Sequence, residues 1–305
     1  MSKPKLNRRL SSLDATFLYL EKKECPLHIG STSVFDGKVS LKDLTKHIED
    51  RLHLIPRYTQ KVVPDPFNIA HPTWERATDF DISNHIFEIK SRKKVTHKDL
   101  ARIAGEKMTD LMDRNKPLWE LFVIPNLEGG KSAMIAKVHH CMVDGISGVD
   151  LIKILFDISP NPEPPPPKTE EEPKQPKPDP TRQFLDSLLG SMEEGMNRFM
   201  EMQGGMMYLA SSVLDPKMAE KLPQVADVLP AATTPAPTLP FNGECSGERR
   251  LAWSEISFTD ARLIKNVLGG TVNDVVLTLL SEAVSRYTRK HGQKTDDRIV
   301  RFMMP

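Results

Sequence analysis

The chain has little cysteine, and what it has forms no recognisable framework. Cys25, Cys141 and Cys245 are the only three in 305 residues, an odd number without a CxxC pair. Disulfide-dependent domains use an even, dense set of cysteines, and cysteine zinc sites use closely spaced pairs. We therefore expect neither a disulfide framework nor a cysteine zinc site. This usage fits a reducing cytoplasm.

Long apolar runs and an excess of one charge are also lacking. A membrane-spanning helix needs about 20 consecutive apolar residues, and no run approaches that length. Residues 1–9 are charged and no apolar core follows them, so we expect no signal peptide. With 42 basic and 41 acidic residues the net charge is +1, which gives no bulk attraction to nucleic acid. The local basic run at residues 90–94 is expected to be a solvated loop, or else a contact for lipid headgroups or a nucleotide phosphate.

The distribution of apolar residues and prolines along the chain predicts three regions. Residues 1–158 are expected to form an α/β domain with helices at 41–54 and 98–112. A strand at 119–124 is expected to form a hairpin with the strand before His139, through a turn at 126–130. Residues 159–240 are expected to be a linker and crossover, because 159–182 hold many of the 25 prolines. Within that region, residues 183–215 have the apolar spacing of one or two amphipathic helices, which either pack on the domains or lie on lipid.

The third region, residues 241–305, predicts the start of a second folded domain. Residues 250–258 alternate as in a strand, and Thr259-Asp260 is expected to cap a short helix that ends near residue 267. A turn at 269–274 precedes a helix at 275–290, and another strand is expected from residue 298. We expect this short second domain to be incomplete in this chain.

Two adjacent histidines followed by Asp-Gly form the most informative motif: His139-His140, then Asp144-Gly145. The apolar run at 133–138 predicts a buried strand, and a helix capped by Ser147 is expected downstream. Side chains alternate across a strand, so only one imidazole can face a cleft and the other is held in the fold. A lone histidine near a strand end is more often structural than catalytic, but the pair with Asp-Gly is more specific. A metal site through His140 and Asp144 is disfavoured, because no third ligand clusters with them.

Several motifs in order along the chain resemble one family. They are residues 10–17 (LSSLDATF), Trp74-Glu75 with Phe80-Asp81-Ile82 and His85, Pro117-Leu118-Trp119-Glu120, the His-His-Asp-Gly motif and residues 271–276 (TVNDVV). Together they resemble the bacterial wax ester synthase/acyl-CoA:diacylglycerol acyltransferases, relatives of chloramphenicol acetyltransferase and of condensation domains. The resemblance implies an α/β fold of two chloramphenicol acetyltransferase-like domains around a tunnel, with the second domain incomplete in this chain.

The resemblance also implies an activity: transfer of a long-chain acyl group from acyl-CoA to diacylglycerol or a long-chain alcohol. Such a transfer needs a base for the hydroxyl proton, and histidine titrates near neutral pH. The resemblance assigns this role to His140, with His139 in the catalytic set for stability or positioning. It makes Asp144 a structural partner of an arginine, while Gly145 lets the loop turn or lets substrate approach the backbone.

No acyl-enzyme is expected. The GxSxG spacing of a serine nucleophile is absent, and Cys141 is expected to point away from its neighbour His140. Asn273 and Asp274 are predicted substrate-binding residues. For Asn273 a helix cap and a tunnel contact have similar weight, and for Asp274 the cap is favoured. Trp74 and Trp119 are expected in the core.

The expected partners are acyl-CoA as a co-substrate, with no cofactor and no metal, and an acyl acceptor collected at a membrane or lipid-droplet surface. A C-terminal fragment that completes the second domain is a further expected partner. Two other functions stay open: a condensation-type or polyketide-associated acyltransferase with a carrier-protein donor, and a non-catalytic lipid-surface protein of this fold.

Overall fold

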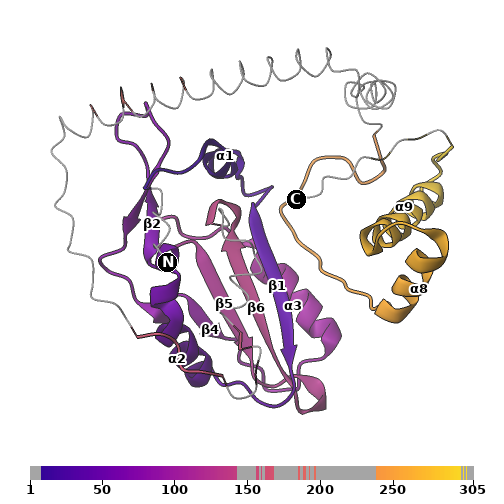
Figure 1. Ribbon diagram of the computed structural model, residues 1–305, viewed down its shortest axis with the longest axis horizontal. Coiled ribbons are helices and arrows are strands. Elements are labelled where there is room, and N and C mark those ends of the chain that lie inside the picture. Colours follow the sequence, from indigo (N-terminus) through magenta and orange to yellow (C-terminus); the bar gives the residue numbers. More distant parts are fainter. Residues whose placement is uncertain are drawn as a thin grey trace. The chain divides into compact units, whose positions relative to one another are not determined.

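A computed structural model describes residues 8–142, 156–157, 159, 162–167, 185, 188–189, 192, 196, 238–296, 298 and 300 (Figure 1). The chain divides into two compact units, which are described separately. The first comprises Met1–Met196 with Cys245–Ala252, and the second comprises Asn197–Glu244 with Trp253–Pro305.

The first unit is built on a four-stranded sheet. Its elements are α1 Ser12–Leu20, β1 His28–Phe35, α2 Leu41–Arg51, β2 Gln60–Val63, β3 Thr73–Arg76, β4 Ile86–Glu88, α3 His97–Thr109, β5 Trp119–Ile124 and β6 Ser132–His139. The sheet order is β1-β6-β5-β4, and β2 and β3 form a separate ladder (Figure 1). The β6 strand is antiparallel to both β1 and β5, whereas β4 and β5 are parallel.

Strand β6 is central, and every one of its residues is buried. Met134 and Val138 belong to an apolar cluster that includes residues of α1 and α2. Ala133 and Ile135 alternate with them and belong to a second cluster that includes residues of α3. Both faces of the strand are therefore covered, as its apolar run predicts.

The predicted elements of this unit are confirmed with small shifts in their bounds. The strand at 119–124 is β5, and it forms the expected hairpin with the histidine strand, which runs from 132 to 139. The helix predicted at 98–112 is α3, which begins at a capping box made by Thr96 and Asp99 and ends at Thr109. The helix predicted at 41–54 is α2 followed by a 3-10 turn over Leu52–Leu54.

A segment far along the chain completes the first unit. Residues 245–252 lie against α3 and the loop before β1, where the Arg249 amide donates to Oγ1 of Thr109 (3.0 Å) and its Nη2 donates to the Pro26 carbonyl (2.8 Å). The close approach requires glycine at position 105, because a Cβ there would lie 2.4 Å from the carbonyl oxygen of Arg249.

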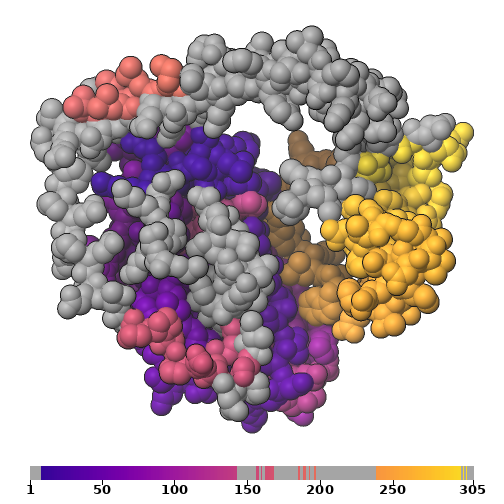
Figure 2. All heavy atoms as spheres, in the orientation of Figure 1, coloured from indigo at the N-terminus to yellow at the C-terminus, as the bar shows by residue number. Residues whose placement is uncertain are grey.

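The second unit contains α8 Phe258–Leu268 and α9 Val272–Lys290. These helices carry exposed large apolar side chains, and Figure 2 shows both in orange to yellow. The most exposed are Leu268 (80%), Val267 (72%) and Phe258 (64%). Among the helices that the structure describes, none is long and apolar enough by itself to span a membrane. The α8–α9 pair, bent by 100°, passes that test only when both helices are counted together.

One predicted element of this region is wrong. Residues 251–257 form no strand, and their side chains are exposed. Alternation of apolar and polar residues is compatible with a strand, but a strand also needs a neighbouring strand for its backbone hydrogen bonds. In the described part of the chain, no strand lies beside residues 251–257. The cap of α8 is Ser257, whose Oγ accepts from the Asp260 amide, rather than the predicted Thr259-Asp260. Of the strand expected from residue 298, only Arg298 and Val300 are described, and neither has strand structure.

Candidate active site at the end of strand β6

The His139-His140 pair lies where β6 ends and a 3-10 turn over His140–Met142 begins. The His139 amide donates to the Leu118 carbonyl at 2.9 Å, and the His140 amide donates to the Leu27 carbonyl at 2.9 Å. Successive amides are thus bound by segments on opposite sides of β6. Leu118 belongs to the Pro-Leu-Trp-Glu motif, so one role of that motif is to hold the backbone of the histidine pair.

His139 is fully buried and surrounded by polar atoms. Its Nδ1 accepts a hydrogen bond from the Cys141 amide at 3.1 Å, and its Nε2 lies 3.3 Å from Oε1 of Glu21. An imidazole nitrogen that accepts from an amide carries no proton. When His139 is neutral, its proton is therefore on Nε2, the nitrogen that lies 3.3 Å from the Glu21 carboxylate.

Glu21 is the centre of a buried polar cluster. Its side chain is only 2% exposed, and Oε1 lies 3.1 Å from Nε2 of His28 and accepts from the Leu27 amide at 3.1 Å. The other oxygen, Oε2, accepts from Nη2 of Arg114 at 3.1 Å. Burial alone raises the pKa of the Glu21 carboxyl, but the contacts with His139, His28 and the Leu27 amide outweigh it. The pKa of Glu21 therefore lies far below its usual range, and the group stays ionised.

His140 has different surroundings from its neighbour. The side chain is partly exposed, and its ring stacks on Phe17 with the centroids 3.7 Å apart and the planes 19° from parallel. Flat stacking restricts rotation of the imidazole but leaves the nitrogens at the ring edge available. Phe17 and Glu21 are four residues apart in and just after α1, so one helical turn contacts both histidines.

Cys141 is buried beside the pair. Burial raises the pKa of its thiol well above the usual value, so the group stays protonated at neutral pH. A thiolate nucleophile at this position is disfavoured, in line with the sequence argument.

The remaining predicted site residues divide into two groups. Asp144 and Gly145 lie outside the described residues and stay predictions. Asn273 is exposed in the first turn of α9, and Asp274 is the third residue of that helix. Oδ2 of Asp274 accepts from the amide and from the hydroxyl of Thr271 at 2.7 and 2.8 Å, and the Thr271 hydroxyl accepts from the Asp274 amide. This capping box lowers the pKa of Asp274 and gives it a helix-capping role.

The tryptophans of the motifs lie in the core. Trp119 is 1% exposed, donates its indole N–H to the Tyr58 carbonyl at 2.8 Å and stacks on His85 with the centroids 4.5 Å apart. His85 is buried, and burial lowers its pKa, so it stays neutral. Trp74 is 4% exposed. Within the described ranges, no group of three or more His, Cys, Asp or Glu side chains could hold a metal ion.

Four residues of this site are not found by sequence reasoning: Phe17, Glu21, His28 and Arg114. His28 faces His139 only because β1 and β6 pair in the register His28↔His139. The one local signal is the i, i+4 spacing of Phe17 and Glu21, which by itself does not distinguish a site from an ordinary helix face.

The comparisons with known proteins decide the family. Residues 10–276 match the model of the wax ester synthase/diacylglycerol acyltransferase catalytic domain. The chain belongs to this family. It is 29% identical over 299 residues to a probable diacylglycerol O-acyltransferase of Mycobacterium tuberculosis, a match that covers 96% of this chain and 62% of the relative. A second M. tuberculosis diacylglycerol O-acyltransferase is 28% identical over 293 residues, which cover 93% of this chain and 55% of the relative.

The fold is likewise that of a solved family member. The wax ester synthase/diacylglycerol acyltransferase of Marinobacter aquaeolei VT8 is similar with a TM-score of 0.60 and 22% sequence identity, over 93% of this chain and 61% of that one. The predicted α/β acyltransferase fold is confirmed. The chain described here spans less than two thirds of the length of each of these three relatives.

Proposed function

We propose that the protein is an O-acyltransferase that moves a long-chain acyl group from acyl-CoA to diacylglycerol or a long-chain alcohol. One observation supports this above the others. In a chain of this family, His140 is partly exposed and flanked by a ring stack, while its neighbour His139 is buried and fixed by Glu21. That is the division of roles that a general base with a structural neighbour requires.

The chemistry follows from this arrangement. His140 takes the proton of the acceptor hydroxyl as the oxygen attacks the thioester carbonyl. The tetrahedral adduct then collapses, the C–S bond breaks and the CoA thiolate leaves. His140 returns the proton to the thiolate. The products are the ester and the free CoA thiol, the base is regenerated, and no acyl-enzyme forms. The buried side chains of His139 and Glu21 and the half-exposed side chain of Arg114 do not touch substrate in this scheme. They hold the strand end and thereby the position of His140.

The remainder of the second domain is part of the proposal. The apolar side chains on α8 and α9 are exposed in this chain, including Leu279 (49%) and Leu280 (47%). Exposed apolar area on that scale is usually covered by a partner surface. A C-terminal segment or fragment that supplies the rest of the fold is the partner that we assign to it.

The acceptor substrates are poorly soluble, so the protein collects them at a membrane or lipid-droplet surface on the cytoplasmic side. Five described residues support this contact: Leu185, Leu188, Leu189, Met192 and Met196 are helical and 38–65% exposed. They stand at positions i, i+3, i+4, i+7 and i+11, which lie on one side of a helix.

The test is an acyl-transfer assay on the protein supplied with any segment that completes its second domain. Long-chain acyl-CoA is incubated with diacylglycerol or a long-chain alcohol, and the ester and free CoA thiol are both measured. His140→Ala is expected to abolish transfer without loss of folding. His97→Ala, at an exposed position of α3, is the matched control and is expected to retain it. Full activity of the His140 variant, or absence of ester with either acceptor, contradicts the proposal.

A further inference from the structure

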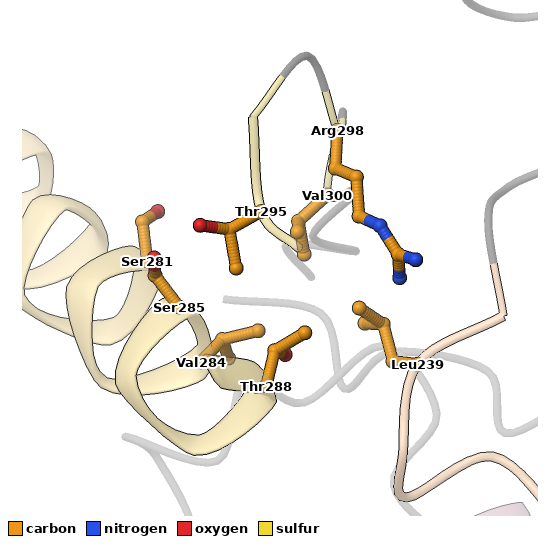
Figure 3. Close-up of a pocket in the computed structure, with 8 residues that line it drawn as sticks. All are labelled: Leu239, Ser281, Val284, Ser285, Thr288, Thr295, Arg298 and Val300. Atoms are coloured by element: carbon orange, nitrogen blue, oxygen red, sulfur yellow. The ribbon is translucent and has the colours of Figure 1, made fainter. Parts of the chain in front are cut away.

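The second unit contains a pocket that the proposed chemistry does not use (Figure 3). Its volume is about 210 Å³, and it lies between the second half of α9 and the segments around residues 239 and 295–300. It is lined by Leu239, Ser281, Val284, Ser285, Thr288, Thr295, Arg298 and Val300.

Among the described residues that line the pocket, one carries a charge, the positively charged Arg298. Nη1 of Arg298 donates to the Thr238 carbonyl (3.2 Å) and to Oε1 of Gln293 (2.9 Å), both of them neutral. The described lining residues include no carboxylate. The nearest acid on that helix, Glu282, is exposed and paired with Arg286 and Arg289. The guanidinium, which points into the pocket beside Leu239 in Figure 3, therefore has no described anionic partner.

A buried hydroxyl without a partner lies in the same pocket. Thr288 is 1% exposed, and among the residues that the structure describes its Oγ1 has no hydrogen-bond partner. A buried hydroxyl left unpaired is unfavourable, so such a group indicates a missing acceptor or donor. Ser285 and Thr295 add two further hydroxyls to the lining, and all come from segments of one unit.

From these observations we infer that the pocket binds a phosphate group. A phosphate oxyanion accepts hydrogen bonds from every side, and an arginine fork with several hydroxyls is a donor set that suits it. The hydroxyl of Thr288, which is otherwise without a partner among the described residues, then has an acceptor. Two sources present this chemistry: free inorganic phosphate, and the phosphomonoester of CoA. Only the second source rests on the proposed acyl transfer.

The test is a binding titration on the folded full chain, with inorganic phosphate, CoA and dephospho-CoA as separate probes. Arg298→Gln removes the charge and Thr288→Val removes the hydroxyl without changing the side-chain shape. Lys290→Gln removes one exposed positive charge from the same helix outside the pocket and is the matched control. Circular dichroism and the melting temperature verify that each variant is folded.

We expect saturable phosphate binding to the wild type and to the Lys290 variant with the same Kd. The Kd should rise by about tenfold or more in the Arg298 variant, and by a smaller factor in the Thr288 variant. If CoA binds more tightly than dephospho-CoA and Arg298→Gln removes the difference, the CoA phosphomonoester occupies the pocket. If the two bind alike while phosphate binding depends on Arg298, free phosphate is the ligand.

Two results overturn the inference. One is a Kd for phosphate that neither Arg298→Gln nor Thr288→Val changes. The other is the absence of saturable binding of phosphate and of CoA at millimolar concentration. If Arg298→Gln does not fold, the Thr288→Val variant decides by itself. None of these binding experiments measures acyl transfer. Their result therefore does not depend on whether the proposed activity is found.

Discussion

Glu21→Gln is the perturbation that examines the buried cluster most directly. Glutamine keeps the size of the side chain but removes the negative charge that lies 3.1 Å from Nε2 of His28, 3.3 Å from Nε2 of His139 and 3.1 Å from Nη2 of Arg114. Removing one partner of a fully buried ion pair costs roughly 3–5 kcal/mol. Here Arg114 is half exposed and returns partly to water, so we expect about 1–3 kcal/mol of lost stability.

The pH dependence of stability tests the same charge. The pKa of Glu21 is lowered in the folded state, so its carboxylate contributes stability that is present above its unfolded pKa, near 4.5. That contribution is lost as the pH falls below this value towards the folded pKa. The wild type should therefore lose stability on acidification below about pH 4.5 more steeply than the Glu21→Gln variant.

The measurement is urea denaturation of the folded chain at neutral pH and at several lower values. Glu24→Gln, an exposed neighbour of Glu21 in the sequence, is the matched control and should behave as the wild type does. Equal free energies of unfolding for the wild type and the Glu21 variant at neutral pH would refute the argument. Parallel acid profiles of the two proteins would refute it independently.

Three further changes probe the site and the packing around it. Phe17→Ala should lower kcat of acyl transfer because His140 loses its ring stack, whereas Phe17→Leu should retain more activity; equal rates for both variants would contradict this role. Gly105→Ala should cost about 1–3 kcal/mol, since its Cβ meets the Arg249 carbonyl, and should speed proteolysis within residues 245–252. Thr271→Ala should cost about 0.5–2 kcal/mol in thermal unfolding through loss of the capping box of α9.

The last two changes have controls on the same helices. Glu106→Ala replaces an exposed residue next to Gly105, and it should leave the proteolysis pattern unchanged. Thr278→Ala removes a hydroxyl that donates to the Asp274 carbonyl within α9, and it should cost less than Thr271→Ala because no orphan amide depends on it. An unchanged melting temperature for Thr271→Ala would show that the capping box does not stabilise α9.

The elements with strong local patterns follow from the sequence alone. The apolar run before His139 and the turn at residues 126–130 predict a hairpin, because buried strands need continuous apolar residues and the glycines permit the reversal. The structure confirms it. Capped helices and tight hairpins depend on contacts between residues that are only a few positions apart. Their own sequence is therefore sufficient to predict them. The motifs likewise identify the family without reference to any contact.

The surroundings of the His139-His140 pair depended on the tertiary structure. His28 and Glu21 meet His139 because β1 pairs with β6 across more than 100 residues of chain, and nothing local specifies that register. The same limit explains the error at residues 250–258, where alternation predicted a strand but no partner strand lies beside it in the described structure. Local periodicity therefore fixed the elements and the family, whereas the electrostatic environment of the histidines came from pairings between distant segments.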